Sequence, residues 1–80
     1  MTFMTVPEID MRATGTNIKN LRKERSLKVS DIQDYFDFNT PQAIYKWERG
    51  DSLPTVDNIF ALSFIFHCTV EEIIILKGEN

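Results

Sequence analysis

The feature of this sequence that most constrains its fold is a series of short segments with helical apolar spacing, separated by residues that begin or end helices. From Val56 to Phe66 apolar residues recur at intervals of three and four, which places a wide apolar stripe on one helix. No segment combines apolar-polar alternation with a two-residue hairpin turn. The chain is therefore predicted to be all-α, with five helices and no sheet.

The helix boundaries follow from the capping residues. Thr40 can accept backbone N–H bonds as an N-cap, Pro41 at the first helical position costs no hydrogen bond, and Gly50 suits the position that ends the helix. We expect a first helix from Thr16 to about Arg25, a second over about 29–36, a third over about 41–49, a fourth after Thr55 that ends near His67, and a fifth after Thr69. Residues 1–13 show no clear period and are predicted to form a mobile N-terminal arm, with the helical domain over 14–80.

Length and composition exclude several classes of protein. The 80 residues suffice for one small domain and contain a single cysteine, so no internal disulfide can form. Paired Cys/His spacing is absent, and we predict neither a metal site nor a cofactor. No apolar run exceeds four residues, and the N-terminus lacks a secretory pattern, which favours a cytoplasmic protein without a membrane segment.

The charge distribution is uneven. The net charge is -3, which by itself argues against a nucleic-acid partner. Residues 12–50 nevertheless hold eight basic and five acidic side chains, whereas residues 51–80 hold one basic and five acidic ones. The central part of the chain is therefore basic, and the C-terminal third is acidic and hydrophobic.

The third predicted helix has an outward face suited to DNA. If Ile44 and Trp47 face the core, the outward positions are Pro41, Gln42, Tyr45, Lys46 and Arg49. A short helix, a turn and such a second helix can place polar side chains in the major groove of B-DNA. The alternative is the ordinary solvated surface of a helical bundle.

Three runs in these segments resemble the Cro/CI-type (lambda repressor-like, XRE-type) helix-turn-helix DNA-binding domains. They are Ile-Lys-Asn-Leu-Arg at 18–22, Ala-Ile-Tyr-Lys-Trp-Glu-Arg-Gly at 43–50 and Pro-Thr-Val-Asp-Asn-Ile at 54–59. The resemblance extends over residues 18–73 and implies a compact five-helix domain whose second and third helices contact DNA. It also implies a non-enzymatic, sequence-specific transcriptional regulator of bacterial, phage or mobile-element origin, expected to repress, to bind double-stranded DNA as a homodimer and to associate with the nucleoid.

The resemblance assigns roles to individual positions. Gln42 and Lys46 match base-contacting positions, and an amide or a lysine can bond purine edges in the major groove. Tyr45, on the same face, is expected to reach a base or a phosphate. Thr40, Arg49 and Lys28 match positions that approach phosphates. Arg22 and Glu48 match an ion pair that joins the first helix to the third in this family.

The sequence also departs from the family pattern. Asp37 and His67 stand where many relatives have glycine, and the turn from Asp37 to Thr40 is one residue longer than usual. Lys28 occupies the expected cap of the second helix, although lysine cannot accept the backbone bond. Ser30 is an alternative cap, which would shift the start of that helix.

Other side chains allow competing interpretations. His67 and Cys68 could suggest a nucleophile and base, and Asp31, Asp34 and Asp37 could suggest a metal site, but neighbouring side chains diverge and the acids are too sparse. We interpret Cys68 as a buried residue, His67 as a helix end and the acids as a solvated face.

Four hydrophobic residues exceed what the predicted core requires: Phe60, Phe64, Ile75 and Leu76. They could extend the core or form a dimer surface, since exposed apolar patches mark partner sites. A second function of a different class is therefore a protein-interaction module, such as an antitoxin or accessory subunit, that binds a protein through the acidic, hydrophobic C-terminal third.

Overall fold

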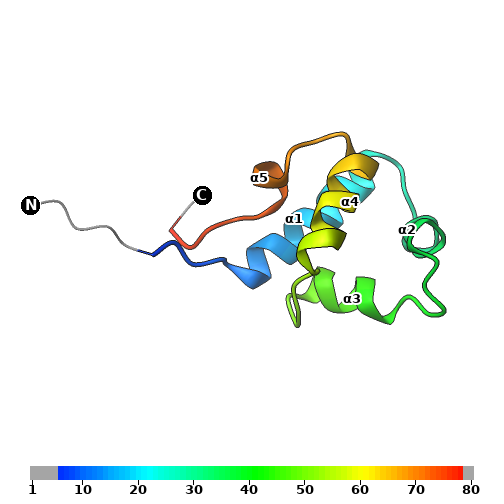
Figure 1. The fold of residues 1–80 in the computed structure, drawn as a ribbon, viewed down its shortest axis with the longest axis horizontal. Helices are drawn as coiled ribbons and strands as arrows, with labels where there is room; N and C mark the ends of the chain where they lie inside the picture. Colours follow the sequence, from blue (N-terminus) through cyan, green and yellow to red (C-terminus); the bar gives the residue numbers. More distant parts are fainter. Residues whose placement is uncertain (1–5, 79–80) are drawn as a thin grey trace, which may run out of the picture.

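Five helices make up the computed structural model, which describes residues 6–78. They are α1 (Met11–Glu24), α2 (Val29–Phe36), α3 (Gln42–Arg49), α4 (Val56–Phe66) and α5 (Val70–Ile73) (Figure 1). The predicted all-α class with five helices is confirmed, and within residues 6–78 the only β pairing is a single antiparallel bridge between Ile9 and Leu76. Residues 1–5 of the predicted arm and residues 79–80 lie outside the described part.

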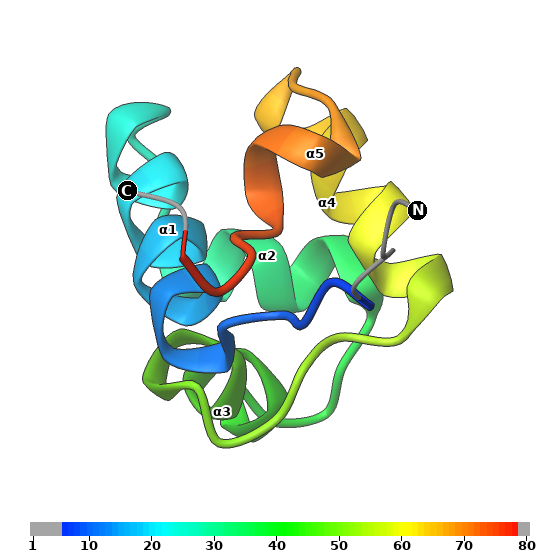
Figure 2. The same cartoon turned by 90° about the vertical axis from the view of Figure 1, so that its left-hand side faces the viewer.

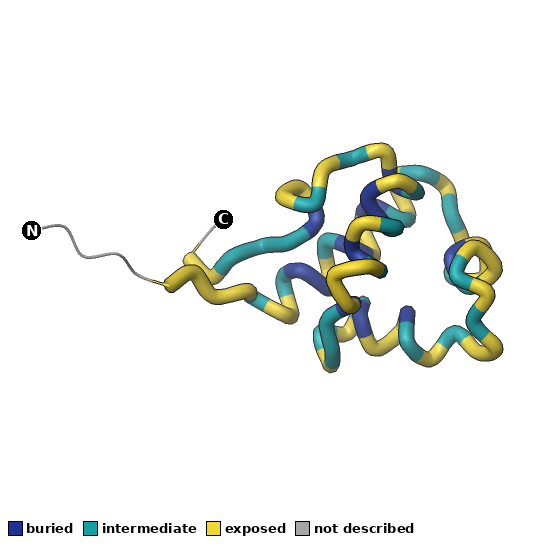
Figure 3. The backbone as a smooth tube through the Cα atoms, in the orientation of Figure 1, coloured by how far each residue is buried: buried dark blue, intermediate teal, exposed yellow. Residues whose placement is uncertain are grey.

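One apolar core holds the helices together. Every helix contributes to it, and Figure 3 shows its buried residues on the inner sides of the helices. The fully buried members include Ile18 of α1, Ile32 of α2, Ile44 of α3 and Leu62 of α4. Because the chain has no disulfide, the burial of these side chains is the main stabilising term.

The start of the first helix differs from the prediction. α1 begins at Met11 and not after Thr16, with Asp10 as N-cap accepting a hydrogen bond from the Ala13 backbone at 2.9 Å. The sequence concealed this turn because its buried residues are Thr14 and Gly15, which carry no apolar signal. Residues 11–13, predicted as part of the arm, therefore belong to α1.

Thr14 is buried because its hydroxyl has backbone partners. It accepts a bond from the Ile75 amide at 2.9 Å and lies 3.3 Å from the Ile75 carbonyl. The Asn17 side chain donates to the Glu72 and Ile73 carbonyls at 2.7 and 2.9 Å. These bonds fix the end of α5 and the segment after it against α1.

The N-terminal and C-terminal segments lie side by side, as Figures 1 and 2 both show. The Asp10 amide donates to the Ile75 carbonyl and the Lys77 amide to the Glu8 carbonyl, each at 2.8 Å. The side chains of Lys77 and Glu8 also form an exposed ion pair. The described residues before α1 are thus joined to the end of the chain.

Left-handed residues other than glycine end two of the helices. Asp37 follows α2 with φ of 58° and His67 follows α4 with φ of 53°, at the two positions where the family resemblance leads one to expect glycine. α2 begins at Val29 as predicted, and its Lys28 N-cap makes no side-chain cap bond; instead the Asp31 carboxylate accepts from the Lys28 amide at 2.7 Å. The alternative start at Ser30 is wrong, because Asp31 supplies the stabilising bond.

The third helix begins one residue later than predicted. α3 starts at Gln42, and Pro41 precedes it in the N-cap position. The Thr40 hydroxyl still accepts a bond from the Gln42 amide, although at 3.4 Å it is long. Gly50 ends α3 as predicted, with a left-handed φ of 79°.

The backbones of α1 and α3 approach each other closely. A Cβ atom added to Gly15 would lie 2.3 Å from the Trp47 carbonyl oxygen and 2.9 Å from the Glu48 carbonyl oxygen. A Cβ atom on Gly50 would lie 2.8 Å from the Arg12 Cα. Only glycine fits at these two positions, and the two glycines allow α3 to cross α1 at this short distance.

Candidate nucleic-acid interface

α3 has one inner and one outer face. Ile44 and Trp47 are buried, as predicted, and the exposed side chains are Gln42, Tyr45, Lys46 and Arg49. Their spacing of three and four residues places them on one side of the helix. In Figure 3 the tube of α3, near the lower edge of the molecule, changes between buried and exposed residues, as expected for a helix with one inner and one outer face.

A bidentate ion pair fixes the inner side of α3. The Arg22 Nε donates to Glu48 Oε2 at 2.7 Å, and Nη2 donates to Oε1 at 3.2 Å. The side chains are only 12% and 7% exposed, and Arg22 Nη1 also donates to the Leu27 carbonyl at 3.1 Å. The hydrogen bond from Glu48 outweighs desolvation and raises the pKa of Arg22 above its ordinary value. The pair joins α1 to α3 and keeps both charges compensated.

The turn between α2 and α3 is held by aromatic packing. The Phe36 and Phe38 rings stack with centroids 5.0 Å apart, and each meets the Trp47 ring edge-on, at 5.6 and 6.0 Å. The Gln33 side-chain amide donates to the Phe38 carbonyl at 3.1 Å. The turn from Asp37 to Thr40 is therefore ordered, and it fixes the direction in which the chain enters α3.

The candidate phosphate-binding residues lie at three helix ends. Lys28 precedes α2, Thr40 precedes Pro41 at the start of α3, and Arg49 is the last residue of α3; all three are exposed. Hydroxyl and cationic side chains, and the backbone amides at helix N-termini, suit phosphate oxygens. Together with the outer face of α3 they form a polar surface whose candidate DNA-contacting side chains are neutral or positively charged.

The sequence interpretation missed one residue of this surface. Asp51, two residues beyond Arg49, accepts a hydrogen bond from Arg49 Nε at 2.8 Å. The spacing of the two residues around Gly50 was a signal, because a helix-ending glycine turns the chain back on the last turn. Gly15 was also missed, since its role depends on a long-range contact.

The four surplus hydrophobic residues lie in different surroundings. Phe60 and Phe64 are 55% and 74% exposed and lie in line with the exposed Val56 on α4. Phe60 borders an apolar groove of about 260 Å³ whose other lining residues are Ile9, Leu53, Pro54, Val56, Ile59, Val70 and Ile74. Leu76 borders a second groove, of about 240 Å³, that shares Val70 and Ile74 with the first. Ile75 is half-buried and bonded to α1.

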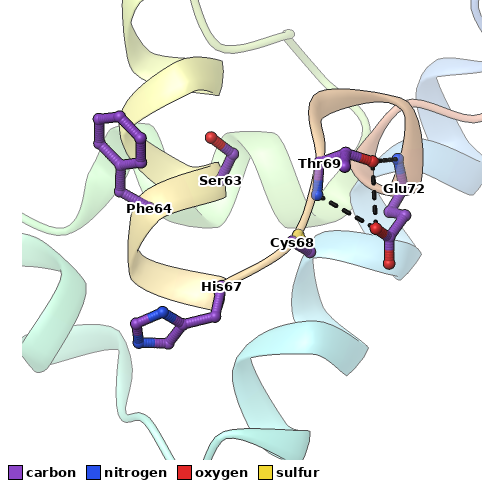
Figure 4. Close-up of a pocket in the computed structure, with 6 residues that line it drawn as sticks. All are labelled: Ser63, Phe64, His67, Cys68, Thr69 and Glu72. Atoms are coloured by element: carbon purple, nitrogen blue, oxygen red, sulfur yellow. Dashed lines mark hydrogen bonds between the residues drawn. The ribbon is translucent and has the colours of Figure 1, made fainter.

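The His67 and Cys68 side chains do not form a catalytic pair. Figure 4 shows the imidazole and the thiol directed to different sides of the turn after α4. Burial raises the pKa of the Cys68 thiol, and Glu72 raises it further, so the nucleophilic thiolate is disfavoured. Within residues 6–78 no group of His, Cys, Asp and Glu side chains could hold a metal ion, and no helix is long and apolar enough to cross a membrane.

Comparison with known proteins agrees with this geometry. The chain is similar to the HTH-type transcriptional regulator DicA of Escherichia coli (strain K12), with 33% identity over 61 residues that cover 74% of this chain and 38% of DicA. It thus spans less than half the length of this relative. Its fold is similar to a crystal structure of the DNA-binding domain of BldD, with a TM-score of 0.68 and 18% identity over 81% of this chain and 93% of that one. The S. venezulae BldD DNA-binding domain gives the same TM-score and identity and is covered to 96%.

The family model described as helix-turn-helix matches residues 18–73, which include α2, the turn, α3 and the ion pair between Arg22 and Glu48. The resemblance in the sequence extends over the same residues. The match confirms the prediction of a Cro/CI-like, XRE-type domain, which is a non-enzymatic DNA-binding class. The chain belongs to the helix-turn-helix family.

Proposed function

We propose that the protein is a sequence-specific DNA-binding transcriptional regulator that inserts α3 into the major groove and acts as a repressor. The observation that carries the proposal is the uncovered outer face of α3, where an amide, a phenol and two cations project from a helix anchored on its opposite side. B-DNA has a major groove about 12 Å wide, which admits a helix of this kind. Repression follows most simply, since occupancy of DNA can block transcription without further contacts.

The individual side chains divide into two groups. Gln42 can bond adenine N6 and N7, Lys46 can donate to guanine O6 and N7, and Tyr45 lies between them on the same face. Lys28, Thr40 and Arg49 flank this face and are assigned to phosphates. The first group selects the sequence, and the second positions the domain.

The relatives support the proposal by their names. DicA is named as a transcriptional regulator, and the matched BldD structures are of a DNA-binding domain. We carry DNA binding and regulation over to this chain because α3 has the exposed polar and cationic groups that contact with DNA requires. A protein bound to DNA in this way would associate with the nucleoid.

We further propose that the active form is a homodimer on a two-fold operator. The support is the apolar surface around Phe60, where two grooves meet at Val70 and Ile74 and continue to Leu76. Phe64 extends this surface by one turn of α4. Sedimentation of a monomer at high micromolar concentration, with and without an operator fragment, would contradict the dimer.

The same apolar surface favours a second candidate function, a protein-interaction module. Exposed Asp57 and Glu71 belong to the helices that border the grooves, and residues 51–80 carry a negative balance. A protein partner with a complementary basic and apolar segment would fit it. This candidate requires neither Gln42 nor Lys46.

In vitro selection of duplexes from a random pool separates the two candidates. A DNA-binding regulator enriches one motif, and its symmetry reports the dimer. In follow-up titrations we expect Gln42→Ala to relax preference at one base pair and Arg49→Ala to weaken all duplexes alike. Asn20→Ala, which removes an exposed amide from α1, is the matched control and should leave binding unchanged. Failure to enrich any duplex at low salt would overturn the proposed function.

A further inference from the structure

The ion pair between Arg49 and Asp51 stands apart from the other ion pairs. Four are formed among residues 6–78, and this one alone contains a side chain from the outer face of α3. Nε donates to Oδ2 at 2.8 Å, and the two side chains are 57% and 53% exposed. Arg49, one of the two cations assigned to DNA phosphate, is therefore already paired within the protein.

The backbone holds Asp51 in this position. The Asp51 amide donates to the Lys46 carbonyl at 2.9 Å and the Gly50 amide to the Trp47 carbonyl at 3.0 Å, around the left-handed Gly50. An acidic side chain beyond a helix C-terminus interacts unfavourably with the helix dipole. The carboxylate thus gains nothing from the helix, and the contact it makes is with Arg49.

We propose that Asp51 is an intramolecular competitor for Arg49, which DNA phosphate must displace, so that Asp51 limits the affinity of the interface for DNA. The inference rests on the proposed function. Carboxylate and phosphate present the same kind of oxygen acceptor to a guanidinium group. Both cannot neutralise Arg49 without repelling each other at short range.

The competition matters because few cations serve this surface. The proposed contacts include Lys28, Lys46 and Arg49, and pairing one of them leaves two. Binding to arbitrary DNA depends on the number of phosphates that cations neutralise. Asp51 therefore keeps sequence-independent binding weak, and the contacts of Gln42 and Lys46 to bases contribute a larger share of the affinity.

A double-mutant cycle with Asp51→Asn and Arg49→Ala tests the inference. Fluorescence anisotropy with the full chain measures the Kd of a selected duplex and of a random-sequence duplex over a series of KCl concentrations. We expect Asp51→Asn to lower the Kd of each duplex by about threefold to fivefold, a change that corresponds to the free energy of an exposed ion pair. The slope of log K against log salt should steepen by about 0.9, as for one more phosphate contact. In the Arg49→Ala background, Asp51→Asn should have no effect.

Glu8→Gln is the matched control, because it removes the same charge from the exposed pair with Lys77, which contains no α3 residue. Its effect on Kd should be small. Equal tightening by Glu8→Gln, or weaker binding by Asp51→Asn, would overturn the inference, as would tightening that persists without Arg49. Absence of duplex binding by the unaltered protein would instead overturn the proposed function.

Discussion

The two faces of α3 differ in how much freedom the fold leaves them. On the inner face, Trp47 and Glu48 meet α1 through backbone contact at Gly15 and through the ion pair with Arg22. On the outer face, the side chains of Gln42, Tyr45 and Lys46 are exposed, and Arg49 forms an exposed pair with Asp51. The difference teaches that the structure fixes the helix and leaves its outer residues free to determine what is bound.

The largest expected effect comes from closing the gap between α1 and α3. Gly15→Ala places a Cβ atom against the Trp47 carbonyl oxygen, a backbone atom that cannot yield by rotation. We expect a loss of more than about 3 kcal/mol in the free energy of unfolding, the upper range for overpacking. Urea unfolding followed by circular dichroism measures it. Stability equal to that of the unaltered chain would show that the crossing is loose and would break the comparison.

A smaller loss is expected from the ion pair on the same face. Arg22→Ala leaves the Glu48 carboxylate, 7% exposed, without its bidentate partner. We expect a cost of about 2 kcal/mol. The matched control is Arg25→Ala, because the pair of Arg25 with Glu24 is more exposed. Arg25 also donates to the Phe66 carbonyl, and Arg25→Ala removes this bond too, so we expect a loss of up to about 1 kcal/mol. If both variants lose the same stability, the Arg22 pair is no stronger than a surface pair.

Substitutions on the outer face should leave stability unchanged. Gln42→Ala and Lys46→Ala remove exposed side chains from the outer face of α3, so the free energy of unfolding should change by less than about 0.5 kcal/mol. Binding to a selected duplex should weaken by about 1–3 kcal/mol for each base contact removed. Thermal unfolding and anisotropy on the same samples separate the two effects. A loss of stability here would mean that the outer face also supports the fold.

The smallest expected effect lies in the turn that precedes α3. Asp37 has a left-handed φ of 58°, which glycine adopts without the Cβ penalty but with a larger loss of backbone entropy. We expect Asp37→Gly to stabilise the domain by about 0.5 kcal/mol, with the Kd for DNA unchanged. Asp34→Gly, within α2, is the control and should destabilise, because glycine is a poor helix residue. A gain in DNA affinity from Asp37→Gly would show that the turn also controls the outer face.

The sequence was sufficient for elements whose signals are local. The bounds of α2 and the end of α3 followed from apolar spacing and from Gly50, and the inward direction of Trp47 followed from the same period. Recognition of the family added the roles of Arg22 and Glu48, and the structure contains their ion pair.

Features that depend on contacts distant in sequence could not be predicted. The first turn of α1 was missed because Thr14 is buried by bonds to Ile75, which lies 61 residues away. Gly15 gave no signal because its partner is the backbone of α3. The pair of Arg49 and Asp51 is different, because it is a local contact across Gly50 that the helix-ending glycine signalled and the sequence interpretation overlooked.

The backbone bonds between residues 8–10 and 75–77 have a consequence for how the domain can be rearranged. Because these two segments are neighbours, a short linker from residue 78 to residue 6 would join points that already lie close together. The chain could then be opened at the exposed Asp51, in the loop after α3, while the linked segments kept their pairing. Such a permuted molecule would keep the same folded core but would have a differently connected unfolded chain. Its folding rate, compared with that of the original chain, would reveal whether the contact between residues 8–10 and 75–77 forms early or late during folding.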